Sequence, residues 1–112
     1  MNPEDPVQRQ LDAYNARDTE RFIAEYAEDI RVYRVPEAEP FLSGKAAFTR
    51  HYATNRFTLP DLHAEVVKRI VCGNKVVDHE RIRGIRDGIV EAIAVYEVVD
   101  NRIRTVWFFN PD

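Results

Sequence analysis

The sequence predicts an α+β domain, and three features of its pattern lead to this fold class. Apolar residues recur at helical spacing in the first half of the chain, whereas the second half alternates in the manner of long β-strands. Turn residues separate these strands at regular intervals. Because helices and strands are segregated along the chain, we expect three N-terminal helices packed on an antiparallel sheet. The length of 112 residues fits a single domain, 1–112.

The first predicted helix begins at Asp5-Pro6. Asp5 can accept a hydrogen bond at the helix N-terminus, and a proline suits the first helical position. Val7, Leu11 and Tyr14 follow at helical spacing and form one apolar stripe. This spacing predicts an amphipathic helix whose stripe faces the core.

A second helix is predicted to begin after Asp18, whose side chain can cap it, and to end near Asp29. Glu20 suits its first turn, since a negative charge there interacts favourably with the helix dipole. The apolar residues at helical spacing form the expected buried face: Phe22, Ile23, Tyr26 and Ala27.

A short pair of strands and a third helix complete the first half. Residues 30–35 alternate and are rich in β-branched and aromatic side chains, which predicts a strand. Phe41-Leu42 predicts a brief return strand. Ser43 is the expected cap of a third helix that runs through about Arg56.

The second half predicts four long strands joined by tight turns. The turn residues are Gly73-Asn74, Asp87-Gly88 and Asp100-Asn101, which divide the region into strands over 62–72, 75–85, 89–99 and 102–109. Among these turns, Asp87-Gly88 is the strongest signal for a two-residue hairpin, because both central positions of that turn need a positive φ.

The two faces of the predicted sheet differ in what they expose. Even positions of residues 89–99 carry no charge, so we expect this face to meet the helices, where Ala92 and Ala94 leave room for a cavity. The last strand is apolar on both faces. An apolar outer face on so small a protein predicts a homodimer through the outer sheet face, with Trp107 and Phe109 beside Ile93 and Val95.

Composition and charge exclude several classes of partner. A net charge of −3 argues against a nucleic-acid partner, and no apolar run approaches the ~20 residues of a membrane span. The lone cysteine, Cys72, and an acidic N-terminus unlike a secretory signal predict a cytoplasmic location. Asp78, His79 and Glu80 alternate between faces of a strand, so we expect no metal site. The sequence has no glycine-rich nucleotide motif, and we expect no cofactor.

Several segments together resemble a known superfamily. They are residues 7–18, Tyr26-Ala27-Glu28-Asp29, residues 43–48, residues 94–98 and residues 103–109. In this order and spacing the chain resembles nuclear-transport-factor-2-like proteins, and it is most similar to their SnoaL-like and ketosteroid-isomerase-like branch. The resemblance implies a cystatin-like α+β cone, in which a strongly curved sheet wraps around the helices and encloses an internal pocket. Such proteins are usually dimers.

The resemblance does not extend to the chemistry of ketosteroid isomerases. Those enzymes use a tyrosine on the first helix, an aspartate base after the first strand and a protonated aspartate on the sheet. By spacing, these three positions fall at Gln10, Arg34 and Ala94, none of which matches. The resemblance therefore implies the fold and a small-molecule pocket rather than that particular set of catalytic groups.

Other charged residues are candidates for chemistry in the pocket. By the alternation of residues 75–85, Asp78 and Glu80 point inward. A carboxylate in an apolar cone has a raised pKa, which suits a general acid or base. Arg34 on the first strand would reach the cavity from its side and hold a facing carboxylate ionised. The alternative is an internal pair of Arg34 and Glu80 that only stabilises the sheet.

Two functional hypotheses follow. The first is a pocket protein that binds a small apolar molecule, with undetermined activity. The second is a cofactor-free isomerase, dehydratase or cyclase that uses Glu80, Asp78 and Arg34 in acid–base chemistry. Tyrosine hydroxyls can orient a ligand in either case, although the same rings can serve only as core aromatics. The fold alone does not decide between the two hypotheses. Expected ligand-binding residues are Tyr14, Tyr26, Tyr52, Ala94, Tyr96, Phe108 and Asn110.

Overall fold

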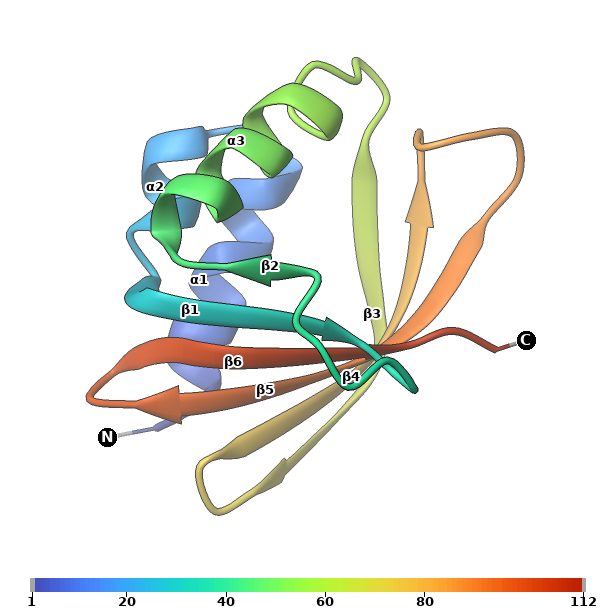
Figure 1. Ribbon diagram of the computed structural model, residues 1–112. Coiled ribbons are helices and arrows are strands. Elements are labelled where there is room, and N and C mark those ends of the chain that lie inside the picture. Colours follow the sequence, from blue (N-terminus) through green and yellow to red (C-terminus); the bar gives the residue numbers. More distant parts are fainter. Residues whose placement is uncertain (1, 112) are drawn as a thin grey trace.

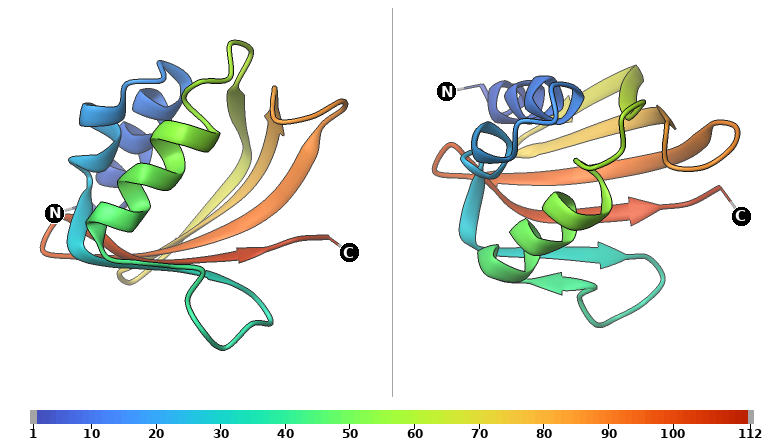
Figure 2. Two further views of the ribbon diagram at one scale, coloured as in Figure 1. Left: turned by 45° about the horizontal axis from the view of Figure 1, so that its top comes forward. Right: turned by 90° about the horizontal axis from the view of Figure 1, so that it is seen from above.

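The computed structural model describes residues 2–111, which form three helices on the concave face of one six-stranded sheet (Figure 1). The sheet curves strongly around the helices without closing into a barrel (Figure 2). The α+β class and the cone shape are therefore confirmed. In chain order the elements are α1 (Glu4–Asn15), α2 (Thr19–Ile23), β1 (Tyr26–Arg34), β2 (Leu42–Ser43), α3 (Lys45–Asn55), β3 (His63–Cys72), β4 (Lys75–Arg83), β5 (Val90–Val99) and β6 (Arg102–Phe109).

The strands follow the order β2-β1-β6-β5-β4-β3 across the sheet. Four of the five pairs are antiparallel, but β1 and β6 run parallel, with Arg31 opposite Thr105. The expectation of a wholly antiparallel sheet was wrong at this pair. The two strands come from opposite ends of the chain, so no hairpin dictates their direction, and most of the chain forms the crossover that a parallel pair requires.

The second predicted helix is much shorter than expected. The side chain of Asp18 does cap it, accepting a hydrogen bond from the backbone N–H of Arg21 at 3.2 Å, but α2 ends at Ile23. Tyr26 already belongs to β1, where the pairing with β6 shifts between Tyr26 and Arg31. Tyr26 and Ile30 are both buried and lie four positions apart, a separation that fits one face of a strand as well as one face of a helix.

The other two helix starts also differ from the prediction. Helix α1 begins at Glu4 after Pro3, without a side-chain cap, so Asp5 contributes a negative charge to the first turn rather than the cap. Ser43 ends β2 and pairs with Arg31. Gly44 takes the N-cap position of α3 in its place, with a φ of 86° that a residue with a side chain rarely adopts.

Two of the predicted turns, Gly73-Asn74 and Asp100-Asn101, each join their strands through two residues, but the turn with the strongest signal does not. Asp100 and Asn101 join β5 to β6 with φ angles of 52° and 62°, as a two-residue hairpin requires. The turn predicted at Asp87-Gly88 is instead part of a six-residue loop, 84–89, which shortens β4 and β5 at that end. A side chain at Gly84 would collide with the backbone carbonyl of Asp61, so the loop starts against that neighbouring segment.

The concave face of the sheet carries the core. The predicted alternation of β5 is confirmed, because its uncharged even positions Ala92, Ala94, Tyr96 and Val98 are buried. Aromatic rings from the helices pack over them, with Phe22 and Phe48 stacked at 5.6 Å between ring centroids. In the described part of the chain, no helix is long and apolar enough to cross a membrane.

Candidate functional site

A cavity of about 310 Å³ lies between the helices and the concave face of the sheet. This volume is at the lower end of the ~300–1,000 Å³ typical of small-molecule sites. The exposed lining residues belong to the C-terminal ends of β1 and β6 and to the neighbouring loops, so the cavity opens on the right-hand side of Figure 1. Its buried lining residues are Gln10, Leu11, Tyr14, Phe22, Tyr26, Val32, Ala64, Glu80, Ala92 and Tyr96.

Four buried polar residues form a hydrogen-bonded chain, which we call the floor network: Tyr26, Gln10, Tyr96 and Glu80. The Tyr26 hydroxyl donates to Gln10 Oε1 at 2.8 Å, and the Tyr96 hydroxyl donates to Glu80 Oε2 at 3.0 Å. Gln10 Nε2 donates to the backbone oxygen of Val7 at 2.9 Å and makes a long contact of 3.5 Å with the Tyr96 hydroxyl. The network holds the Glu80 carboxyl in one orientation at the base of an apolar cavity.

The electrostatics of the floor network favour a neutral Glu80. Burial raises the pKa of Glu80 to about 7, with a further contribution from the negative charge of Asp78, while the hydrogen bond from Tyr96 and the positive charge of Arg69 oppose the shift. Burial also raises the pKa of Tyr96 and of Tyr26 well above the usual value, so both hydroxyls stay protonated and act as donors. A carboxyl group with a pKa near neutrality can both accept and return a proton.

One oxygen of the Glu80 carboxyl faces the cavity. Oε2 is held by Tyr96, whereas Oε1 has no hydrogen-bond partner among residues 2–111. Every fully buried side-chain oxygen and nitrogen in this part of the chain has a partner, so Oε1 is accessible from the cavity that Glu80 lines. Tyr52 also lines the cavity, and its hydroxyl likewise makes no hydrogen bond with the described residues. The cavity therefore presents an acid–base oxygen and an unengaged hydroxyl.

Asp78 is inward and buried as predicted, but it lies outside the lining of the cavity. Its two oxygens accept hydrogen bonds from the guanidinium group of Arg69, at 2.7 Å from Nε and 3.0 Å from Nη2. Arg69 is inward because a bulge at Val67 shifts the register of β3, which changes the direction of every later side chain on that strand. Asp78 is thus neutralised by a fork-like ion pair and not exposed to a ligand.

Arg34 lines the cavity, but the structure does not bring it to Glu80. No ion pair within 4.0 Å joins the two residues in the described chain. The Arg34 guanidinium lies over the ring of Phe41, with its carbon 3.4 Å from the ring centroid. The expected internal pair of Arg34 and Glu80 was therefore wrong, since Arg34 sits at the exposed end of β1 and Glu80 is deep in the cavity.

Most of the predicted ligand-binding residues line the cavity. Ala94 does not, although it is buried on the expected face, because it is paired with Asp78 at the filled part of the cone. Ala92, paired with Glu80, lines the cavity in its place. The predicted residues that do line it are Tyr14, Tyr26, Tyr52, Tyr96, Phe108 and Asn110.

Sequence reasoning missed several lining residues that the helical spacing could have revealed. Gln10 lies on the inward stripe of α1, between Val7 and Tyr14. Arg56 follows Tyr52 by four positions, so it continues the inward face of α3. Arg86 comes from the loop 84–89, and nothing in the local sequence places it at the cavity. Among residues 2–111, no group of three or more His, Cys, Asp or Glu side chains is arranged to hold a metal ion.

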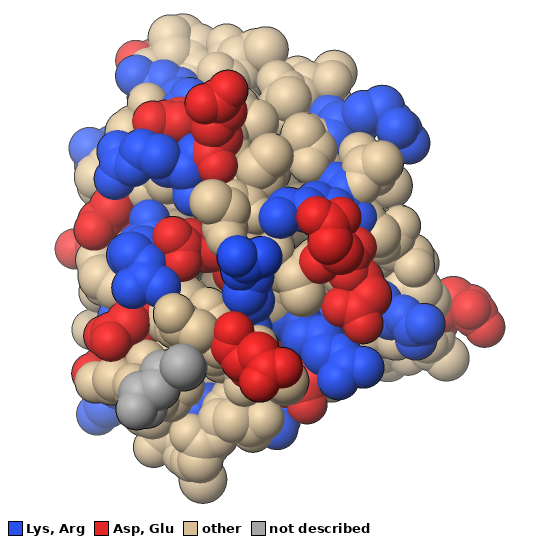
Figure 3. All heavy atoms as spheres, turned by 90° about the vertical axis from the view of Figure 1, so that its left-hand side faces the viewer, with Lys and Arg blue, Asp and Glu red and all other residues tan. Residues whose placement is uncertain are grey.

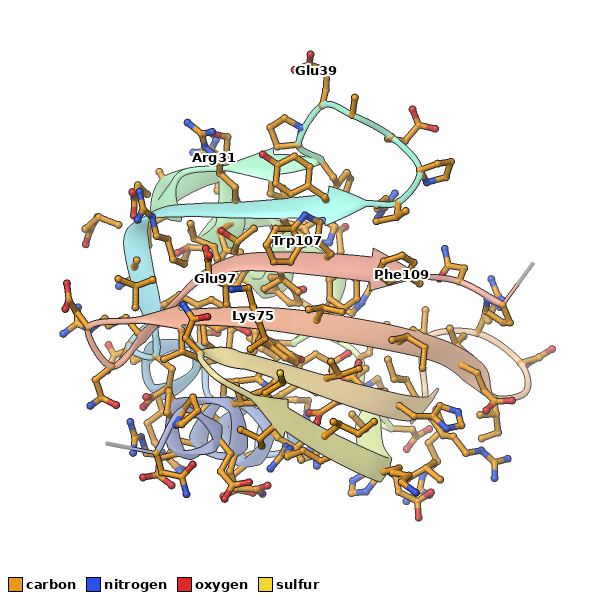
Figure 4. All side chains as sticks on the ribbon, turned by 90° about the horizontal axis from the view of Figure 1, so that it is seen from below. Arg31, Glu39, Lys75, Glu97, Trp107 and Phe109 are labelled. Atoms are coloured by element: carbon orange, nitrogen blue, oxygen red, sulfur yellow. The ribbon has the colours of Figure 1, made fainter. Side chains whose placement is uncertain are left out.

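The outer face of the sheet differs from the concave face. His79 Nε2 on β4 lies 2.8 Å from Glu91 Oε1 on the neighbouring strand β5. Trp107 stacks on Tyr33 with ring centroids 6.2 Å apart. Glu97 lies near Trp107 on the same face, and the exposed ring of Phe109 lies further along β6 (Figure 4). This face therefore combines aromatic surface with charged side chains.

The fold and the cavity define the class of protein: an α+β cone with an internal pocket. The family model of the SnoaL-like domain matches residues 7–106, so the chain belongs to the SnoaL-like domain family. The superfamily resemblance found in the sequence is thereby confirmed. A comparison with the curated proteins gives no match.

Solved structures of similar proteins show the same fold. A cystatin-fold protein from Novosphingobium aromaticivorans is 21% identical with a TM-score of 0.85, covering 96% of this chain and 97% of that one. A candidate ketosteroid isomerase from Kribbella flavida is 23% identical with a TM-score of 0.84, covering 98% and 78%. A candidate polyketide cyclase from Sinorhizobium meliloti is 23% identical with a TM-score of 0.79, covering 93% of each chain.

Proposed function

We propose that this protein binds a small apolar molecule in its cavity and that Glu80 transfers a proton to or from that molecule. The observation that carries the proposal is the position of Glu80: a single carboxyl group at the base of an apolar cavity, with one oxygen held by Tyr96 and the other accessible. A pKa of about 7 supports the role, because acid–base groups work best when their pKa is near the working pH.

A proton shift on a carbonyl compound fits this arrangement. Glu80 in its carboxylate form removes a proton from the carbon next to the carbonyl, and the electron pair of the C–H bond moves onto the carbonyl oxygen. The Tyr52 hydroxyl is placed to donate a hydrogen bond to that oxygen, which stabilises the developing charge. Where the ketone carries a β,γ double bond, the enolate is conjugated with it: the electron pair on oxygen re-forms the carbonyl, the β,γ double bond shifts to the α,β position, and the γ-carbon takes the proton back from neutral Glu80. The product is then the conjugated isomer and all atoms balance. Two of the similar structures carry the names of an isomerase and a cyclase, which supports this reaction class.

Isotope exchange in a small apolar ketone tests the proposal. We expect the protein to accelerate the exchange of the acidic C–H protons of 2-tetralone in D₂O, followed by NMR. Glu80→Gln keeps a hydrogen-bond acceptor for Tyr96 but cannot accept a proton, so its exchange rate falls by about 100-fold or more. The rate of the unmodified protein rises with pH through about 7, as the base form of Glu80 accumulates.

The matched control is Glu91→Gln, which makes the same change in charge on the outer face of the sheet and leaves the exchange rate unchanged. Tetralone binding, measured by displacement of the neutral fluorophore N-phenyl-1-naphthylamine, is retained in Glu80→Gln. Equal exchange rates in the protein and in Glu80→Gln would contradict the role of Glu80. Binding without any accelerated exchange would favour the non-catalytic pocket protein.

The outer face supports a second proposal, that two copies associate through the sheet. Phe109 is 40% exposed and lies beside Trp107 on an aromatic surface that a second copy would cover. Light scattering at micromolar concentration is expected to report about twice the chain mass. Trp107→Glu buries an unpaired charge at the interface and converts the protein to a monomer, whereas Arg102→Glu does not. A monomeric unmodified protein would contradict the proposal.

We also propose that the protein is cytoplasmic. The free, exposed thiol of Cys72 supports this location, because unpaired cysteines persist in reducing compartments. Imaging of a fluorescent fusion in the native cell tests it, and a membrane-bound or exported fusion would contradict it.

A further inference from the structure

Three arginines from separate parts of the chain line the mouth of the cavity, and we call them the rim arginines: Arg34, Arg56 and Arg86. Arg34 ends β1, Arg56 follows α3 at its C-terminal cap, and Arg86 belongs to the loop 84–89. Neither Arg34 nor Arg86 is buried, and Arg56 is half-buried. The fold thus brings three cations to one opening, although they are up to 52 positions apart in the sequence.

None of the rim arginines forms an ion pair with another described residue. The guanidinium of Arg34 lies over Phe41, and Nη1 of Arg56 donates to the backbone oxygen of Asn55 at 3.0 Å. Glu80 is the one acidic residue in the described lining, and it lies at the base. The rim arginines therefore have no ion-pair partner within 4.0 Å among the described residues.

Another face of the molecule has a different distribution of charge. On the face that lies to the left in Figure 1, acidic and basic side chains are interspersed (Figure 3). Ion pairs such as Arg9–Glu25 at 2.9 Å and Arg104–Asp29 at 3.4 Å neutralise charges elsewhere. The rim arginines differ from these residues, because they line a cavity and have no ion-pair partner among the described residues.

The rim arginines act at a distance from Glu80. Arg56 and Arg34 both contribute to lowering the pKa of His51, after burial as the main cause, so both lie near this ring. Burial raises the pKa of Tyr52 to about 12, Glu80 adds to the shift, and Arg56 and Arg34 oppose it. Tyr52 is thus influenced from both sides, whereas the cation that acts on Glu80 is Arg69. Tyr52, Glu80 and the rim arginines line the same cavity, so a ligand that reaches from the rim to Glu80 can also contact Tyr52.

We propose that the rim arginines bind the carboxylate of an amphipathic small molecule whose apolar body fills the cavity down to Glu80. The planar guanidinium fork matches a carboxylate in shape and charge, and bidentate pairs of this kind are among the strongest hydrogen bonds in proteins. A bound anion also gains a favourable charge interaction with the arginines that line the same cavity. This inference rests on the proposed function for the position of the ligand, and it adds the class of ligand: a carboxylic acid with a reactive carbon in its apolar part.

Two aromatic probes of one shape test the inference. 2-Naphthoate carries a carboxylate and 2-naphthalenemethanol carries a neutral hydroxyl, and both can displace N-phenyl-1-naphthylamine from the cavity. We expect the carboxylate to bind about tenfold more tightly at low salt, which corresponds to one good charge-assisted contact. Raising the salt from about 0.05 M to about 0.5 M shortens the range of charge interactions and reduces this preference, without weakening the neutral probe.

Arg56→Gln is the informative variant, and Arg50→Gln is its matched control. Arg50 belongs to α3 and Arg56 is its C-terminal cap, but Arg50 is exposed and outside the cavity lining. Arg56→Gln is expected to lose most of the preference for the carboxylate while binding the alcohol unchanged. Arg50→Gln removes the same charge and keeps the preference. Naphthalene-2-sulfonate, as a third probe, shows whether the rim prefers a planar carboxylate to a tetrahedral anion.

The possible results distinguish failure of the rim inference from failure of the proposed function. If the alcohol binds and the carboxylate binds no better at low salt, the rim inference is wrong while the proposed function stands. If neither probe displaces the fluorophore, the pocket proposal itself is contradicted and the inference falls with it. Should Arg56→Gln not fold, the salt dependence of the two probes on the unmodified protein gives the same decision.

Discussion

Asp78 and Glu80 lie two positions apart on β4, face the same side of the sheet and are both buried, yet their surroundings differ. Asp78 is fully buried and accepts hydrogen bonds from Nε and Nη2 of Arg69. Glu80 receives one hydrogen bond, from a neutral tyrosine, and its other oxygen is accessible from the cavity. The Asp78 carboxylate therefore joins β4 to β3 in the filled part of the cone, whereas the Glu80 carboxyl group is available to a ligand.

The difference arises on the neighbouring strand. Val66 is paired with Glu80, and the bulge at Val67 then places Arg69 opposite Asp78. Without the bulge, Lys68 would occupy that position. A single extra residue in β3 thus gives a bidentate partner to one acid only. Burial by itself does not make a carboxylate reactive, and the presence or absence of a cationic partner decides its role.

The largest expected effect comes from removing the cation. Arg69→Met leaves the charge of Asp78 buried without its partner, and we expect a loss of about 3–5 kcal/mol in the free energy of unfolding. Urea denaturation measures it. Adding Asp78→Asn to the same variant removes the stranded charge and is expected to restore part of the stability. A loss below about 1 kcal/mol would mean that the pair does not hold this part of the cone.

The second prediction concerns Glu80→Gln and the dependence of stability on pH. Glu80 has a higher pKa folded than unfolded, so the folded protein retains a proton between about 4.5 and about 7 that the unfolded chain has released. The contribution of Glu80 to the free energy of unfolding therefore falls by roughly 3 kcal/mol as pH rises through this range. Urea titrations of both proteins at several pH values are expected to diverge, with Glu80→Gln gaining in relative stability up to about pH 7. Parallel curves would contradict the raised pKa.

Ala94 and Ala92 on β5 test the difference between the filled region at Asp78 and the cavity at Glu80. Ala94 is paired with Asp78 in the filled region, so Ala94→Leu overpacks the core and is expected to cost about 1–3 kcal/mol. Ala92 is paired with Glu80 and lines the cavity, so Ala92→Leu costs less in stability but weakens binding of N-phenyl-1-naphthylamine. Thermal melts and fluorescence titrations separate the two effects. Equal destabilisation with equal loss of binding would show that the cavity and the filled region are not distinct.

The smallest expected effect is that of Tyr96→Phe. This change removes the hydrogen bond that opposes the rise in the pKa of Glu80, so the pKa should increase further. We expect the pH at half-maximal proton exchange to move upward by about one unit, the size of one lost hydrogen bond to a charged group. A downward shift would mean that Tyr96 stabilises the neutral form of Glu80 instead.

The inner face of the sheet was predictable from the sequence because alternation of side chains is a property of any regular strand. Ala92, Tyr96, Asp78 and Glu80 all lie on the side that the pattern of β4 and β5 indicated. The partner of Asp78 was not predictable in this way, because the bulge in β3 reverses the direction of Arg69 without any local signal in the sequence.

The parts of the site that come from distant segments were also beyond the local pattern. Arg34 was expected to reach Glu80, but its position at the end of β1 is set by the parallel pairing of β1 with β6. Arg86 reaches the rim only because the loop 84–89 is longer than the turn that Asp87-Gly88 indicated. The positions of Arg34 and Arg86 depend on strand pairing and loop length, and the local sequence pattern does not indicate either of these.

The pKa of the Glu80 carboxyl group, measured directly, tests the central claim. ¹³C NMR of the side-chain carboxyl, assigned by comparison with Glu80→Gln, follows its chemical shift over a pH titration. The position of Glu80 at the base of the cavity predicts a midpoint of about 7. A midpoint near the ordinary value of about 4.3 would contradict a buried, unpaired carboxyl group and with it the acid–base role proposed for this site.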